Sequence, residues 1–71
     1  MGKERHRQTV NYKVRFLGED QVDLRHNGVY DCIAECFCDG KLEDIAVVDL
    51  SGEDYMYNPK HFEKVEDSQE R

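Results

Sequence analysis

Residues 49–65 read DLSGEDYMYNPKHFEKV, and this stretch decides the fold that the sequence predicts. Ser51 and Gly52 indicate a turn, because glycine adopts positive φ angles without steric cost. Pro59 is the only proline of the chain, and its fixed φ suits the first position of a helical turn. Residues 60–62 leave room for one 3₁₀ turn and nothing longer. The stretch therefore predicts a turn, a short strand, a 3₁₀ turn and a closing strand.

The side chains of this stretch predict which face is buried. Tyr55 and Tyr57 lie on one side of a strand and Met56 on the other, because successive side chains alternate. We expect Met56 to enter the core and the two tyrosines to lie at the surface with hydrated hydroxyl groups. Phe62 is expected to fill one end of the core, and Val65 is the inward residue of the closing strand.

The preceding residues also alternate with the period of β-strands. Residues 29–38 are rich in β-branched and aromatic side chains, which favour strand over helix. Asp39 and Gly40 form the strongest hairpin signal in the chain, and residues 42–50 are the return strand. The first strand is expected at residues 10–17, where one apolar face is formed by Val10, Tyr12, Val14 and Phe16.

The chain is expected to form one domain, because 71 residues are too few for two. Within it, a long loop at residues 18–28 carries Val22 and Leu24 at a spacing that holds the loop against the core. The predicted organisation is a flexible basic arm at residues 1–9, a β-barrel domain at residues 10–66 and a flexible acidic tail at residues 67–71.

This order of elements resembles the Src-homology-three-like barrel over about residues 10–66. The string from Gly52 to Glu63, Gly-Glu-Asp-Tyr-Met-Tyr-Asn-Pro-Lys-His-Phe-Glu, is especially similar to small uncharacterised bacterial members of Gram-positive type. The resemblance implies an all-β, five-stranded Src-homology-three-like barrel with a 3₁₀ turn before the last strand. A non-catalytic binding or regulatory module is the function that we expect for such a domain.

Eukaryotic members of that family bind proline-rich peptides through an aromatic groove. Tyr57, Pro59 and Phe62 match positions that border the groove. The chain departs from the pattern elsewhere, because it has no tryptophan and Asp44 stands about where the family has one. Proline-rich peptides are therefore not the expected ligand.

Charge is unevenly distributed along the chain, whose formal net charge is −6. Residues 1–17 carry five basic and one acidic side chain, whereas residues 18–55 carry two basic and eleven acidic ones. An acidic body repels phosphate groups, which argues against nucleic-acid binding. The chain has no run of about 18 apolar residues, and its first residues lack a secretory signal. We therefore expect a cytoplasmic protein that does not associate with membranes.

Four residues form the candidate binding site for a protein or peptide partner: Tyr55, Tyr57, Pro59 and His61. Aromatic side chains on an acidic surface suit a partner that carries basic residues. A structural homo-oligomer, such as a homodimer built on an edge strand, is an alternative that the sequence leaves open.

The cysteines raise a further alternative, a small metal-binding or thiol-redox domain that uses Cys32, Cys36, Cys38 and His26. On a regular strand the three cysteines share one face, with Cys32 and Cys36 roughly 13 Å apart. Zinc binds sulfur at about 2.3 Å and needs its ligands far closer together. We therefore expect no metal and no cofactor. We also expect no catalytic residues, because neither His26 nor His61 forms a known nucleophile motif with a cysteine.

Overall fold

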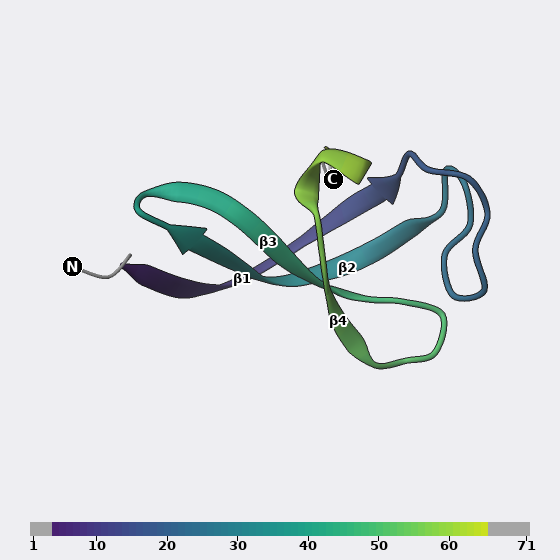
Figure 1. Ribbon diagram of the computed structural model, residues 1–71. Coiled ribbons are helices and arrows are strands. Elements are labelled where there is room, and N and C mark those ends of the chain that lie inside the picture. Colours follow the sequence, from purple (N-terminus) through teal and green to yellow (C-terminus); the bar gives the residue numbers. More distant parts are fainter. Residues whose placement is uncertain (1–3, 66–71) are drawn as a thin grey trace, which may run out of the picture.

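The computed structural model describes residues 4–65 and contains five β-strands and one 3₁₀ turn (Figure 1). All strand pairs are antiparallel, and the sheet order is β4-β3-β2-β1-β5. The all-β class and the 3₁₀ turn before the last strand are therefore confirmed. The elements are β1 (Arg5–Phe16), β2 (Val29–Cys38), β3 (Lys41–Val48), β4 (Asp54–Tyr57), η1 (Pro59–His61) and β5 (Phe62–Val65).

Across residues 4–65, strand pairing does not close the sheet. Strands β4 and β5 stand at its opposite ends and do not pair with each other. Aromatic packing joins the two ends instead, because the ring centroids of Tyr57 and Phe62 are 5.6 Å apart and those of Phe16 and Phe62 are 5.2 Å apart. A five-stranded sheet is shown, and its closure into a barrel stays a prediction.

Strand β1 begins at Arg5, five residues earlier than the sequence predicted. Residues 5–9 pair with residues 34–38 of β2, and the backbone N–H of Asp39 donates to the carbonyl oxygen of Glu4 at 2.8 Å. This part of the predicted arm is therefore ordered as strand. Its side chains are exposed on both faces of the sheet, so the hydrophobic alternation that marks a half-buried strand is missing. The rest of that arm, residues 1–3, and the predicted tail lie outside the described residues.

The turn between β2 and β3 confirms the hairpin signal of the sequence. Asp39 has a φ of 54° and Gly40 a φ of 82°. A two-residue hairpin of type I′ requires positive φ at both central positions, which Asp-Gly adopts readily. The start of β1 and this hairpin project together on one side of the molecule, and the long loop lies at the other end (Figure 1).

The core lies on the inner face of the curved sheet. Leu24 reaches it from the long loop and is 1% exposed, as expected, whereas Val22 is 85% exposed and does not hold the loop. The buried cluster consists of Val14, Phe16, Leu24, Tyr30, Cys32, Ile45, Val47 and Phe62.

The orientation of β4 differs from the sequence prediction. Met56 is 45% exposed, whereas Tyr57 is half-buried against the core cluster. Tyr57 pairs with Ile45, a member of the buried cluster, whereas Met56 pairs with Ala46, which is buried but does not belong to that cluster. Cross-strand partners share a face, so this register turns Tyr57 inward and Met56 outward. The expected inward position of Met56 is therefore wrong.

Phe62 is the residue whose truncation tests this core. We expect Phe62→Ala to lower the free energy of unfolding by about 3–5 kcal/mol, because it opens a cavity where three aromatic rings meet. Met56→Ala is the matched control and should cost less than about 1 kcal/mol, since its side chain is half exposed. Urea unfolding followed by circular dichroism measures both values. Equal losses for the two variants would contradict this assignment of the core.

Candidate functional site

The candidate site is a groove of about 320 Å³ between the long loop and η1. Its floor is apolar and contains Phe16, Leu24 and Phe62, three members of the buried cluster. Polar side chains stand around that floor. The complete lining is Phe16, Gly18, Glu19, Gln21, Leu24, Tyr57, His61 and Phe62.

The long loop is held at both of its ends. Where it leaves β1, the backbone N–H of Leu17 donates to the carbonyl oxygen of His61 at 2.8 Å. Where it returns, the N–H of Asn27 donates to the carbonyl oxygen of Phe16 at 2.7 Å, with Asn27 at a φ of 68°. A Cβ atom on Gly18 would lie 2.6 Å from Phe16 Cζ, so only glycine lets the loop pass this close to the ring. These contacts hold the long loop against β1 and η1, on either side of the groove.

His26 stabilises the long loop through two hydrogen bonds within it. Its backbone N–H donates to Asp20 Oδ1 at 2.8 Å, and its ring Nδ1 lies 2.9 Å from the carbonyl oxygen of Gly18. The side chain that the sequence offered as an alternative metal ligand is therefore occupied in bridging the two ends of the loop.

Asp49 holds the side chain of Tyr57, the tyrosine that lines the groove, in place. Its buried carboxylate accepts hydrogen bonds from the Tyr57 hydroxyl at 2.6 Å and from the Ser51 backbone N–H at 2.9 Å. The Ser51 hydroxyl donates to the same carboxylate at 2.5 Å. These donors lower the pKa of Asp49, with Ser51 as the largest cause. Burial, together with the bond to Asp49, raises the pKa of Tyr57.

Two of the four predicted binding residues line the groove and two do not. Tyr57 and His61 face it. Pro59 lines a separate hollow of about 150 Å³ between β1, β3 and β5. Tyr55 is 50% exposed, donates its hydroxyl to Glu53 at 3.0 Å, and lines neither of these two hollows.

Sequence reasoning missed the contribution of the long loop and the role of Asp49. Glu19 and Gln21 line the groove, but no local pattern in the sequence shows which loop residues face the 3₁₀ turn. The role of Asp49 could have been found in part from the sequence. An aspartate side chain often accepts a hydrogen bond from the backbone N–H two residues later, which is the pattern of an Asx turn. The distance from Asp49 to Tyr57 along the chain concealed the second partner.

The structure separates the three cysteines. Cys32 belongs to the buried cluster, but the register between β2 and β3 shifts between Cys32 and Ala34. After the shift Glu35 pairs with the buried residue Ile45, so Glu35 continues the inner face and Cys36 lies on the outer face. The expectation that all three cysteines share one face is therefore wrong.

The cysteines also do not form part of a cluster of metal ligands within the described residues. Across residues 4–65, no three side chains of His, Cys, Asp or Glu come together in a way that could hold a metal ion. The alternative set of Cys32, Cys36, Cys38 and His26 is not assembled.

A polar network lies beside the core. The Tyr12 hydroxyl donates to Glu35 Oε2 at 2.5 Å, and Lys64 Nζ lies 4.5 Å from the centre of the Tyr12 ring. Burial raises the pKa of Tyr12 and also that of the Cys32 thiol. A buried thiol with a raised pKa is a poor nucleophile, because the thiolate is the reactive form. We therefore assign Cys32 a packing role.

The comparisons with known proteins identify no relative. No protein-family model matches the chain, and no match was found among curated proteins or solved structures. In the part of the chain that the structure describes, no helix has the length and apolar character needed to cross a membrane. What the groove binds is therefore inferred from its own chemistry.

The pH dependence of stability tests the role of Asp49. The pKa of Asp49 is lowered in the folded state, so its contribution is present above the unfolded value of about 3.9 and is lost as the pH falls through the folded value. We expect the free energy of unfolding to fall less between pH 5 and pH 2 (roughly the window of a lowered aspartate pKa) for Asp49→Asn than for the unmodified protein. Urea unfolding at a series of pH values measures the difference. Parallel pH profiles for the two proteins would contradict this role.

Proposed function

We propose that the protein is a non-catalytic binding module that holds a short segment of a partner protein in the groove between the long loop and η1. The observation that supports this most directly is the combination of an apolar floor with two polar aromatic side chains, Tyr57 and His61, at its rim. Grooves of this kind anchor one or two large side chains of a peptide. The resemblance of the sequence to Src-homology-three-like domains of bacterial type supports the same class of function.

The size of the groove favours an aromatic or long aliphatic side chain as the anchor. About 320 Å³ is at the lower end of the range for small-molecule pockets. Phe16, Leu24 and Phe62 are only 3%, 1% and 8% exposed, so this floor is already packed in the free protein. Little ordering is needed on this side of the complex, which lowers the entropic cost of binding.

The charge around the groove favours a basic partner. Glu19 lines the groove, and Asp20 and Asp23 lie in the same loop. The backbone N–H of Leu50 donates to the carbonyl oxygen of Asp23 at 3.0 Å, which holds the acidic turn after β3 beside that loop. A lysine or arginine next to the anchor side chain would be attracted by these negative charges. The attraction would chiefly increase the rate of association.

The groups with displaced pKa values support a binding role over a catalytic one. Tyr57 and Asp49 are hydrogen-bonded to each other, and Tyr12 is hydrogen-bonded to Glu35. Catalytic acids and bases need a proton that is available to a substrate. In these two pairs each tyrosine proton is held by a structural carboxylate.

We propose that the module acts in the cytoplasm as a regulatory or adaptor domain.

A structural homo-oligomer is the second candidate function. Strand β4 is an edge strand, and it leaves Tyr55 half exposed and Met56 45% exposed, with Leu50 56% exposed just before it. Apolar side chains beside an open edge favour association with a second copy. Sedimentation at several concentrations tests this candidate, and a mass of one chain at all of them would contradict it.

Selection from a random peptide library tests the groove. We expect the selected peptides to carry a large apolar residue next to lysine or arginine. The double variant Glu19→Gln/His61→Ala should weaken their binding at least about tenfold, which corresponds to about 1.4 kcal/mol. Isothermal titration calorimetry measures the affinity. Two-dimensional amide NMR spectra should show the largest shifts at residues of the long loop and η1.

The matched control for this experiment is Tyr55→Ala. Tyr55 is an exposed aromatic residue in the same region but outside the groove, so its loss should change the affinity less than about twofold. If Tyr55→Ala abolished binding while the double variant had no effect, the groove would not be the binding site.

A further inference from the structure

Three strands extend beyond the buried cluster as a projecting ribbon, which is formed by residues 5–9 of β1, 34–38 of β2 and 41–44 of β3. Strand β5 pairs with β1 only at residues 13–16. Residues 5–12 of β1 therefore have no strand partner on their outer edge within the described part of the chain. An open edge of this length is a template for pairing with another extended segment.

The hydrogen-bond pattern shows which backbone groups face that edge. The carbonyl oxygen of Glu4 accepts from the N–H of Asp39, so Glu4 turns its backbone groups toward β2. Backbone direction alternates along an antiparallel strand. The N–H and C=O groups of Arg5, Arg7 and Thr9 therefore point away from β2, toward the open edge.

The edge is basic, in contrast to the rest of the folded body. Residues 5–12 include Arg5 and Arg7 and no carboxylate. Arg5 makes a long ion pair with Glu43 at 3.6 Å, in which both side chains are well exposed. Arg7 is exposed and makes no ion pair with any residue of the range 4–65. An acidic segment lying along the edge would meet the positive charge of Arg7 and that of the exposed Arg5.

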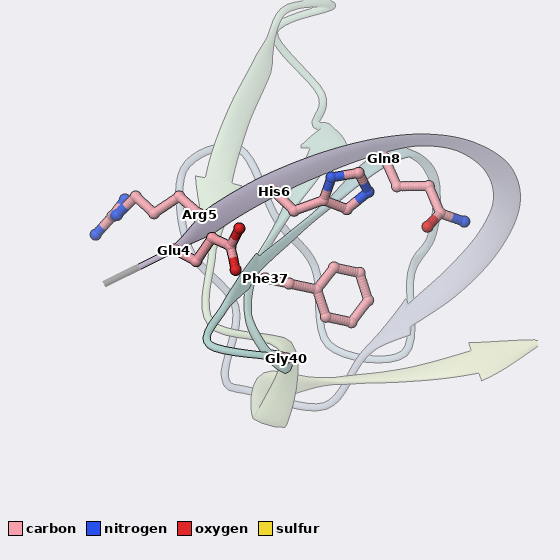
Figure 2. A pocket seen from close by; sticks show the side chains of 6 residues that line it. All are labelled: Glu4, Arg5, His6, Gln8, Phe37 and Gly40. Atoms are coloured by element: carbon pink, nitrogen blue, oxygen red, sulfur yellow. The ribbon is translucent and has the colours of Figure 1, made fainter. Parts of the chain in front are cut away.

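A hollow of about 470 Å³ lies beside the same edge (Figure 2). It is lined by Glu4, Arg5, His6, Gln8, Phe37 and Gly40. Figure 2 shows His6 and Phe37 on the same side of the ribbon, with Arg5 directed away from them. The ring centroids of His6 and Phe37 are 6.4 Å apart. Alternate side chains of an added strand point to this face, where the hollow can receive one apolar side chain.

We propose that the outer edge of β1, at residues 5–12, binds an extended acidic segment of a partner protein as an additional strand. Main-chain hydrogen bonds to Arg5, Arg7 and Thr9 supply the affinity that is common to all extended segments, and the hollow beside Phe37 selects an apolar side chain. The basic side chains of the edge select glutamate or aspartate at the other positions.

Charge argues against a second copy of this chain on the edge. Antiparallel pairing of two β1 edges would bring the basic residues of one copy against those of the other. Like charges directly opposite each other destabilise a strand pair. An acidic partner removes that repulsion and neutralises Arg7.

The edge and the groove are separate sites with opposite charge. Arg7 and Phe16 are nine residues apart on β1, which corresponds to roughly 30 Å along an extended strand. The groove at Phe16 has acidic surroundings, whereas the edge at Arg7 is basic. The two tests use different residues and different probes. A negative result for the edge therefore does not contradict the proposal for the groove, and a negative result for the groove does not contradict the proposal for the edge.

A labelled ten-residue peptide that alternates glutamate with valine tests the edge, with a peptide that alternates lysine with valine as its control. Fluorescence anisotropy should show binding of the acidic peptide only, and the binding should weaken as salt is added. Amide hydrogen exchange should slow at Arg5, Arg7 and Thr9 when the acidic peptide is bound. Equal binding of both peptides, or no binding of either, would overturn the proposal.

Three variants separate the backbone from the charge. Thr9→Pro removes an outward N–H, a change that edge strands tolerate, and should weaken binding at least about tenfold. Arg7→Gln should weaken binding about two- to fivefold, as expected for an exposed ion pair. Lys60→Gln removes the same charge from η1, far from the edge, and should leave the affinity unchanged. Amide NMR spectra confirm that each variant is folded.

Two further outcomes would assign the edge to another occupant and overturn the proposal. Self-association that Thr9→Pro abolishes would show that a second copy occupies the edge. Peptide binding that appears only after removal of residues 66–71 would show that the edge belongs to the chain's own acidic residues, which include Glu66, Asp67 and Glu70.

Discussion

The rest of the structure depends on the aromatic contact between Tyr57, Phe62 and Phe16. Tyr57 ends the strand at one edge of the sheet, and Phe62 begins the strand at the other edge. In the described part of the chain no strand pairing joins those edges, so the packed rings hold the two ends of the sheet together over the core. The buried Asp49 holds the Tyr57 hydroxyl and so contributes to the same contact. Pro59 sets the short turn that brings Phe62 back to Phe16.

The same contact creates the groove. Phe16 and Phe62 form its floor, and the backbone of His61 accepts a hydrogen bond from Leu17 at the start of the long loop. Fold and candidate site therefore share residues, and substitutions in the floor will affect both stability and binding. The projecting ribbon is different, because its backbone edge lies outside the core cluster. Its surface can change with little effect on stability.

Two of the four binding residues that the sequence predicted line the groove, which has eight lining residues in all. Tyr57 and His61 were found because they flank the only proline, in a stretch with strong local signals. Glu19 and Gln21 were missed, because a polar loop carries no period that shows which side chains face inward. Tyr55 and Pro59 were included on the strength of their residue type, but Tyr55 lies opposite Val47, two residues before Tyr57 on β4, and Pro59 lines a separate hollow. Local composition indicates that residues suit a surface, and only packing shows which surface they form.

The sequence by itself determined the β-strand content, the Asp-Gly hairpin, the 3₁₀ turn at Pro59 and the burial of Phe62, because each depends on backbone preferences or on alternation within a few residues. The tertiary structure alone decided three other features: the inward turn of Tyr57, the separation of Cys32 from Cys36, and the extension of β1 back to Arg5. Each of these depends on strand register. Register is set by partners that are distant along the chain, and a one-residue bulge reverses the face on which every following side chain lies.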